Sequence, residues 1–225
     1  MTKRRRYRLL CPIARALDVL GDRWTLLILR DLHAGPARFQ ELQEGLGIAT
    51  NLLSTRLGEL VEAGMIERFE SASSAGYRLT DVGRRSDRVL WELARFGAGV
   101  TRDATPKEPG NLRTIALPLR ILLESATDRP ELCAVLIVSD AEFTIMSTPQ
   151  SVDVQWGRTL EQVDVVARTD YEAFLDLGGG VISIDEFGAN HLELVEGEEH
   201  AAVFFALMAS AGATVAFPDS GAVKA

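Results

Sequence analysis

The sequence predicts a mixed fold in two parts. The N-terminal part, residues 1–100, is mostly α-helical with one β-hairpin, and the C-terminal part, residues 113–213, is an α+β domain. Helical periodicity dominates the first part, whereas apolar and alternating strand-like segments dominate the second. Between them, TRDATPKEPGN combines prolines, a glycine and charges, which is typical of a linker, and we assign the linker to residues 101–112. Residues 214–225 are expected to form a tail.

The charge of the chain changes sign at this boundary. Residues 1–110 contain 18 Lys and Arg against 14 Asp and Glu, a balance of +4, whereas residues 111–225 contain 6 against 18, a balance of -12. The overall charge of -8 therefore hides a basic part. A basic part joined to an acidic part indicates a polyanionic partner for the basic part alone.

Each N-terminal element follows from its periodicity and its end signals. Pro12 and Gly21 delimit the first helix, Gly35 and Pro36 stop the second, and Thr80 is the expected N-cap of the last. MIERFE and YRLT, on either side of SASSAG, predict a hairpin. The expected helices are 12–21, one beginning at Arg23, 38–47, 50–63 and a single long helix over 81–100.

This order of helices and a hairpin amounts to a winged helix-turn-helix. Such domains place one helix in the major groove of DNA and lay the hairpin wing along the backbone. Duplex DNA is the polyanion that the basic charge of this part requires. We therefore expect the helix over 50–63 to read DNA.

The C-terminal elements are predicted in the same way. Four consecutive segments have strand character, and a further strand precedes the closing helix. The expected elements are a helix in LPLRILLESA, strands in ELCAVLIVSD, EFTIMST, SVDVQW and QVDVVAR, a helix in DYEAFLDL, a strand in HLELVEG and a helix in EEHAAVFFALMASA. This order predicts one sheet covered by helices.

The helix over 50–63 has two chemically different faces. At about 100° per residue, its leucines gather between about 280° and 340° from Thr50, and small polar residues with Gly58 occupy about 0° to 140°. An ordinary solvated face is the alternative, but such faces usually carry Lys and Glu pairs, which support a helix better. Small polar side chains can reach base edges and phosphates. The candidate contacts on this helix are Thr50, Asn51, Ser54 and Thr55.

Four arginines accompany this helix. Arg38 begins the preceding helix, and Arg68 and Arg78 lie on the hairpin strands, so these three are candidates for phosphate contacts. Arg56 projects near 240°, on the side away from the polar arc, by the same count of about 100° per residue. We expect Arg56 to make an ion pair or a carbonyl contact inside the domain.

Several linked motifs over residues 9–98 resemble the HxlR family of winged-helix transcription regulators. They are Cys–Pro before the first helix, GDRWTLLILRDL, GPARFQEL, LSTRLGELVEAGMIER and YRLTDVG. The resemblance implies binding to palindromic operators as a homodimer built through the first and last helices. Where the family often has Ser–Pro at the start of the reading helix, this chain has ATN. The implied dimer residues are Leu17, Leu20, Leu90, Trp91 and Phe96, of which Trp91 and Phe96 have an intramolecular core as their alternative.

The resemblance also implies a possible role for Cys11, because some family members sense oxidants or electrophiles through the matching cysteine. An inert cysteine is the alternative. With Cys133 far away and no histidines at ligand spacing, neither a disulfide nor a zinc site is expected. The function is then open between a ligand-responsive repressor and a redox switch.

Residues 113–213 resemble a sterol-carrier-like lipid-binding domain, in VDVVARTDYEAFLDLGGGVISIDEF and HLELVEGEEHAAVFFALM. The resemblance implies a cavity beneath helices and an apolar effector. The closing helix is apolar nearly all round, which predicts burial on more than one side. The expected pocket residues are Phe174, Phe204, Phe205, Leu207 and Met208, with ordinary core packing as the alternative. A lipid carrier with a degenerate DNA domain is a further alternative function.

Catalysis, metals and membranes are not expected. His33, His191 and His200 are isolated in the sequence, and no nucleophile-elbow, phosphate-loop or dinucleotide motif is present. The basic N-terminus is broken by Arg15 and Asp18, unlike a signal peptide, and no apolar run reaches the length of a membrane span. We expect a cytoplasmic protein that is not an enzyme and has no cofactor.

Overall fold

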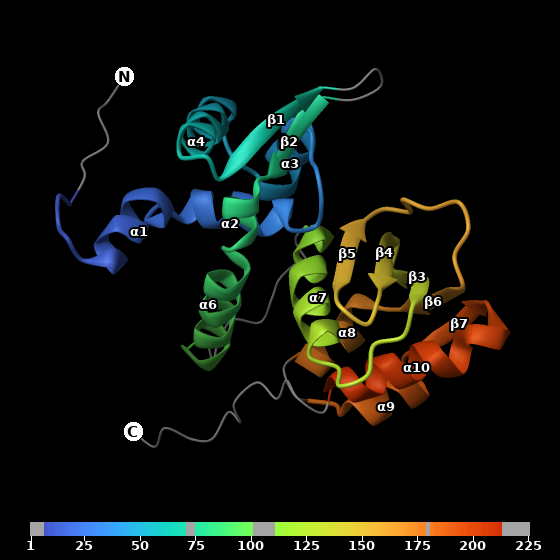
Figure 1. Ribbon diagram of the computed structural model, residues 1–225. Helices are drawn as coiled ribbons and strands as arrows, with labels where there is room; N and C mark the ends of the chain where they lie inside the picture. The colour runs from blue at the N-terminus through green and yellow to red at the C-terminus, as the bar shows by residue number, and fades with distance from the viewer. Residues whose placement is uncertain (1–6, 71–74, 101–110, 179–180, 213–225) are drawn as a thin grey trace. The chain divides into compact units, whose positions relative to one another are not determined.

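The computed structural model describes residues 7–70, 75–100, 111–178 and 181–212 (Figure 1). The chain divides into two compact units, Met1–Leu90 and Trp91–Ala225, and each is considered by itself. Residues 101–110 of the expected linker, the expected tail and the hairpin tip at 71–74 lie outside the described residues. Among the described residues, none of the helices combines the length and apolar character needed to cross a bilayer.

The N-terminal unit is built on leucine-rich helix faces. Its core includes Ile28, Leu42, Leu53, Leu57 and Ile66, each at most 1% exposed. Gly47 closes the third helix with φ +61°, a left-handed turn that glycine adopts without strain. The elements are α1 (Pro12–Leu20), α2 (Arg23–Leu32), α3 (Phe39–Leu46), α4 (Thr50–Glu62), β1 (Ile66–Glu70) and β2 (Ala75–Leu79). The predicted helices and hairpin are thus confirmed up to residue 79.

The prediction of one long helix over 81–100 is wrong. Two helices, α5 (Asp81–Arg84) and α6 (Asp87–Val100), meet at a break. The Ser86 hydroxyl donates to the Gly83 carbonyl at 2.7 Å and lies 3.0 Å from Nε2 of His33. A Cβ on Gly83 would lie only 1.9 Å from the Met65 carbonyl oxygen, so α5 packs tightly on the start of β1. These buried contacts, which no periodicity reveals, outweigh the continuous helical pattern. Thr80 caps α5, as predicted.

The C-terminal unit is a five-stranded mixed sheet with helices packed against it (Figure 1). The strands lie in the order β5-β4-β3-β6-β7, with β3 and β6 parallel and the other neighbours antiparallel. The strands are β3 (Leu132–Val138), β4 (Ala141–Ser147), β5 (Val152–Trp156), β6 (Val165–Thr169) and β7 (Glu193–Glu196), and the helices are η1 (Leu112–Ile115), α7 (Ala116–Glu124), α8 (Tyr171–Gly178), α9 (Ile184–Asn190) and α10 (Glu198–Gly212). The predicted mixed sheet with helices is confirmed, and all five expected strands are present, but α9 was not among the expected elements.

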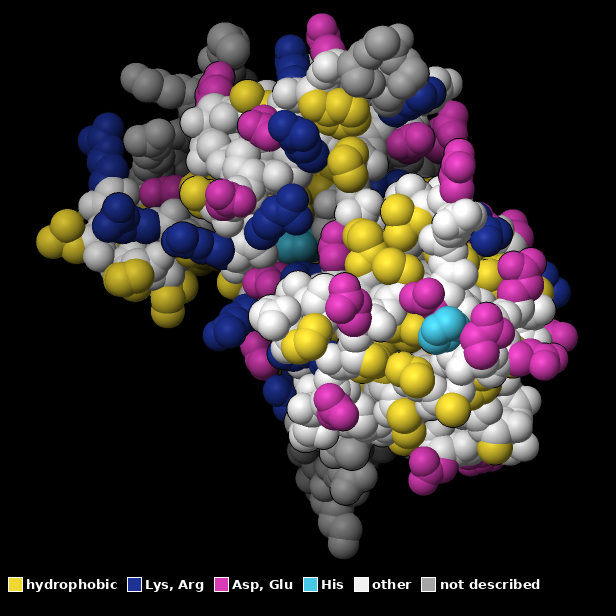
Figure 2. Space-filling view, turned by 45° about the vertical axis from the view of Figure 1, so that its right-hand side comes forward, with side chains coloured by type: hydrophobic (Ala, Val, Ile, Leu, Met, Phe, Trp, Pro, Cys, Tyr) yellow, Lys and Arg dark blue, Asp and Glu magenta, His cyan; other side chains and the backbone are white. Residues whose placement is uncertain are grey.

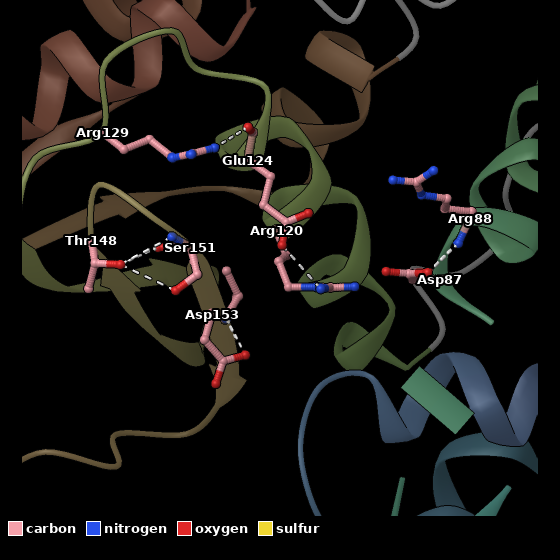
Figure 3. A network of polar contacts seen from close by, with 9 residues as sticks. Asp87, Arg88, Arg120, Glu124, Arg129, Thr148, Ser151 and Asp153 are labelled. Carbon is pink, nitrogen blue, oxygen red and sulfur yellow. Dashed lines mark hydrogen bonds and ion pairs between the residues drawn. The ribbon is translucent and has the colours of Figure 1, made fainter. Parts of the chain in front are cut away.

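The helices α7 and α10 cover the sheet, with α7 against β5 and α10 against β6. Arg129 joins the end of α7 to the β4–β5 turn. It donates to the carbonyl of Glu124 at 2.7 Å (Figure 3) and to the carbonyl of Pro149 at 3.0 Å. Within that turn, Thr148 and Ser151 exchange backbone and side-chain hydrogen bonds. These contacts fix the helix over the buried face of the sheet.

Helix α10 is buried around only part of its circumference. Phe204, Leu207, Met208 and Ala211 are at most 2% exposed and lie on one face, whereas Val203 is 39% exposed. α10 contacts α7, α9 and β6, so several neighbours share in its burial. The burial does not extend all round, because an outer face made largely of alanines stays exposed.

Candidate nucleic-acid interface

The outer face of α4 carries a contiguous set of small polar side chains. Thr50, Asn51, Ser54 and Thr55 are all exposed. The amide of Gln43 donates to the Thr50 hydroxyl at 2.8 Å, which ties α4 to α3. The Thr55 hydroxyl donates to the Asn51 carbonyl, also at 2.8 Å. The structure therefore brings the four predicted residues together on one solvent-facing surface, and their contact with DNA stays a prediction.

The opposite face of α4 is anchored in the core. Leu53, Leu57 and Leu60 are at most 1% exposed. Beside them, Arg56 donates to Asp22 at 3.0 Å and to Glu59 at 2.7 Å, with its side chain 21% exposed. Burial alone would lower the pKa of the Arg56 guanidinium, but the hydrogen bond to Glu59 and the charges of Asp22 and Glu59 raise it overall. The predicted structural role of Arg56 is confirmed.

The three other arginines differ in their surroundings. Arg38 is the exposed N-cap residue of α3, and its backbone N–H donates to the Glu41 carboxylate at 2.8 Å. The Arg68 guanidinium lies 5.7 Å from the centre of the Tyr77 ring. All three are exposed. Figure 2 shows Lys and Arg side chains, in dark blue, interspersed with Asp and Glu side chains, in magenta, over the visible surface.

Arg78 has a partner that the sequence reasoning missed. Glu67 lies opposite Arg78 in the hairpin register, and their side chains form an ion pair at 2.7 Å. Half of the Arg78 side chain remains exposed. This ion pair could have been predicted from the sequence, because the register of the hairpin places Glu67 and Arg78 opposite each other. The charge of Arg78 is thus partly compensated before any phosphate approaches.

The expected dimer residues separate into two groups. Leu17 and Phe96 are 44% and 70% exposed, and Leu20 and Trp91 are half-buried. Leu90, at 8% exposure, is buried within the chain, so its side chain offers little surface for the expected dimer contact. Other exposed apolar residues, which were not among the expected dimer residues, include Leu10 and Ile13 near the start of α1 and Val89 and Leu93 on α6. On α6 the exposed residues Val89, Leu93 and Phe96 follow helical spacing and form one apolar stripe.

The two cysteines lie in unlike surroundings. Cys11 is exposed at the N-cap position of α1, where its carbonyl accepts the N–H of Arg15 at 3.1 Å. Cys133 is half-buried in β3. Burial, followed by the negative charges of Asp164 and Glu131, raises the pKa of the Cys133 thiol. Cys11 is therefore the more accessible of the two thiols.

The C-terminal unit has an apolar hollow of about 290 Å³ between α9 and α10. Phe205 and Met208, both predicted pocket residues, line it. Phe204 and Leu207 instead pack fully buried on the inner face of α10, and Phe174 lies on α8 outside the lining. The remaining lining residues, which the sequence reasoning missed, are Ile184, Asp185, Phe187, Gly188 and Ala209. Within the described residues, no group of His, Cys, Asp and Glu could hold a metal ion.

Comparisons with known proteins agree with the fold of the N-terminal unit. A family model described as an HxlR-like helix-turn-helix matches residues 19–104. The HTH-type transcriptional regulator sll1512 of Synechocystis is 34% identical over 93 residues, which are 40% of this chain and 69% of that protein. The chain belongs to the HxlR family. The matched region of the family model ends at residue 104, so it does not reach the sheet of the C-terminal unit.

Two further relatives extend the HxlR comparison. The HTH-type regulator Rv3095 of Mycobacterium tuberculosis is 47% identical over 88 residues, 38% of this chain and 56% of its own length. The matched part of this protein thus spans about half the length of that relative. YodB of Bacillus subtilis is 35% identical over 89 residues, 37% of this chain and 80% of YodB. A solved structure of quinone-bound YodB has 33% identity and a TM-score of 0.36, covering 39% of this chain and 97% of that one.

Proposed function

We propose that this HxlR-family protein is a sequence-specific DNA-binding regulator, acting as a homodimeric repressor on palindromic operators. The observation that carries the proposal is the exposed face of Thr50, Asn51, Ser54 and Thr55 on a helix that its leucines hold in the core. Small hydroxyl and amide groups can approach base edges closely, and Asn can make a bidentate contact with adenine. The apolar stripe of α6 and a second apolar stripe on α1, formed by the exposed residues Ile13 and Leu17, support a dimer contact.

A selection experiment tests this proposal. The full-length protein is incubated with random 30-base-pair duplexes, bound duplexes are recovered, and the affinity for the enriched sequence is measured at several salt concentrations. We expect one palindromic sequence to be enriched, and its affinity to fall steeply as salt rises. A protein that shows no preference over competitor DNA would instead favour the lipid carrier with a degenerate DNA domain.

For the C-terminal unit we propose a sterol-carrier-like domain that binds an apolar effector and is not an enzyme. The hollow lined by Phe187, Phe205 and Met208 supports this, because small-molecule sites are concave and mostly apolar. A coupling of about 1–3 kcal/mol between effector and DNA would change DNA affinity about 5–150-fold. We place the protein in the cytoplasm, where its DNA partner is.

Native mass spectrometry tests the effector proposal, because it reports subunit number and any co-purified lipid together. Gly188→Leu fills the hollow from α9 and should remove a co-purified apolar molecule. Leu175→Ala, on the exposed surface of α8, serves as the matched control. A bound molecule that remains at full occupancy in Gly188→Leu would place the site elsewhere.

A redox switch through Cys11 is a second candidate function, favoured by the exposure of this thiol at the start of α1. Oxidation there would alter the apolar surface of α1 that we assign to the dimer. The test compares DNA binding of wild type and Cys11→Ser after treatment with diamide. Equal responses of the two proteins would remove this candidate.

A further inference from the structure

Gly58 lies in the middle of α4, where glycine is unfavourable. Apart from proline, glycine is the residue that least supports a helix interior, because it loses the most backbone freedom on folding. Gly58 has an ordinary negative φ, and a Cβ built on it would meet nothing within 4 Å. By contrast, a Cβ on Gly83 would collide with the Met65 carbonyl. The packing of the described residues therefore gives no reason for glycine at position 58.

The position of Gly58 on α4 supplies a reason outside the chain. It is half-buried and lies one turn after Ser54, on the side of α4 that carries the polar face, roughly 10 Å along the helix axis from Asn51. The major groove of DNA is about 12 Å wide. If the first turns of α4 reach base edges, Gly58 comes to the wall of the groove, which is the sugar–phosphate backbone of one strand.

One turn beyond Gly58, the exposed carboxylate of Glu62 lies on the same face. A carboxylate repels phosphate, so a DNA strand that crosses α4 must pass on the N-terminal side of Glu62. Gly58 lies between Ser54, one turn earlier on α4, and Glu62, one turn later. It is therefore the position at which a DNA strand can cross this helix. The lack of a side chain there brings the helix backbone nearest to the strand.

We propose that Gly58 is the point of closest approach between α4 and the sugar–phosphate backbone of one DNA strand. It is a positioning residue, and the proposal rests on the proposed function as a DNA-binding regulator. A methyl group at this point pushes the strand away and weakens the contacts that Ser54 and Thr55 make with it. Because backbone contacts carry no sequence information, the loss extends to every duplex.

The test uses full-length Gly58→Ala and Gly58→Met, since both side chains suit a helix better than glycine. Leu175→Ala is the control, because Leu175 is an exposed position on helix α8 that belongs neither to the polar face of α4 nor to the lining of the hollow. Thermal unfolding is followed by circular dichroism. Affinity is measured on the duplex enriched by the wild-type protein and on a random-sequence duplex.

We expect Gly58→Ala to unfold about 2–8 °C higher than wild type. We also expect it to bind both duplexes at least fivefold more weakly, with a larger loss for Gly58→Met. Leu175→Ala should leave the affinity for both duplexes unchanged. Glu62→Gln should tighten binding to both duplexes, since it removes a charge that repels the strand.

Unchanged affinity of Gly58→Ala would overturn the proposal, as would a loss confined to the enriched duplex, which would indicate a base contact. Either result leaves the proposed function standing if wild type still enriches a sequence. If wild type enriches none and binds random duplex no better than an unrelated acidic protein does, both the proposed function and the role of Gly58 are overturned.

Discussion

The guanidinium of Arg56 in α4 donates to the carboxylate of Asp22 at 3.0 Å, across 34 residues of chain. Asp22 also accepts the N–H of Trp24 at 3.0 Å and so caps α2. One carboxylate therefore joins the start of α2 to the middle of α4. The orientation of α4 depends on this contact as well as on its leucines.

Replacing Arg56 with Ala should lower the free energy of unfolding of the N-terminal unit by about 1–3 kcal/mol, because a charged hydrogen bond between half-buried groups is lost. Asp22→Asn, which keeps an oxygen for the cap, should lose less. Urea denaturation of both single variants and the double variant measures their coupling. The exposed Arg95–Glu92 pair, at 3.4 Å, is the control, and Arg95→Ala should change stability by at most about 0.5 kcal/mol. Additive losses for Arg56 and Asp22 would contradict a direct interaction.

The ion pair of the hairpin gives a second prediction. Glu67→Gln should tighten DNA binding two- to fivefold on any sequence, about 0.4–1 kcal/mol, since it releases Arg78 from its partner. Arg78→Ala should weaken binding on all sequences and reduce the slope of log affinity against log salt by about 1. Titrations at several salt concentrations measure both effects. A loss in Arg78→Ala confined to one operator would show that Arg78 reads sequence.

Asn51→Ala should relax the sequence preference of the protein. If Asn51 makes a bidentate base contact, its loss costs about 1–3 kcal/mol on the preferred sequence and little on random DNA. The selection experiment on wild type and Asn51→Ala measures the change, with Asn190→Ala on α9 as the control. An unchanged preference would exclude base reading by Asn51.

The apolar stripes of α1 and α6 predict a change of subunit number. Ile13→Asp and Phe96→Asp, at two side chains that are each 70% exposed, should convert a dimer into monomers, because a carboxylate is costly to bury between apolar surfaces. Leu175→Asp, 40% exposed on α8, should leave the dimer intact. Sedimentation velocity distinguishes the two states. A dimer that survives in both α1 and α6 variants would place the interface elsewhere.

Cys133 should react more slowly with iodoacetamide in the folded protein than in the urea-unfolded chain, both measured in Cys11→Ser. Its raised pKa keeps the thiol protonated, and only the thiolate attacks. The raised pKa contributes to stability at pH values below the ordinary thiol pKa, and this contribution is lost as the pH rises through the folded-state value. The difference in iodoacetamide reaction rate between the folded and the unfolded protein should narrow at alkaline pH, because the thiol is then deprotonated in both states. Equal rates at pH 7 would contradict the burial of this thiol.

The two faces of α4 could be predicted from the sequence because they depend on helical geometry alone. The same geometry placed Arg56 away from the polar arc, where the structure has its ion pairs. The break before α6 could not be predicted, since it depends on Ser86 meeting His33, 53 residues earlier in the chain. Periodicity describes one element at a time and contains no information on such a contact.

The C-terminal unit shows the same limit. The strands and most of the helices were predicted from their patterns, but α9 was not, and the hollow between α9 and α10 depends on how these two helices pack. Apolar character pointed to Phe204 and Phe205 alike, and the structure buries the first completely while the second lines the hollow. Which side of an apolar helix faces a core is decided by its neighbours.

The parallel pairing of β3 with β6 has a consequence for the order of synthesis. Strand β3 cannot pair with β6 until the ribosome has added Val165, the partner of Ala134 in the parallel register. Strand β7 and helix α10 are synthesised later still. The helices of the N-terminal unit meet partners close by in the chain, so we expect this unit to fold first as the chain emerges. Each newly made molecule then passes through a period in which α4 is complete and the domain that we propose to bind an effector is not. Any effect of that domain on DNA binding can begin only after α10 has been synthesised.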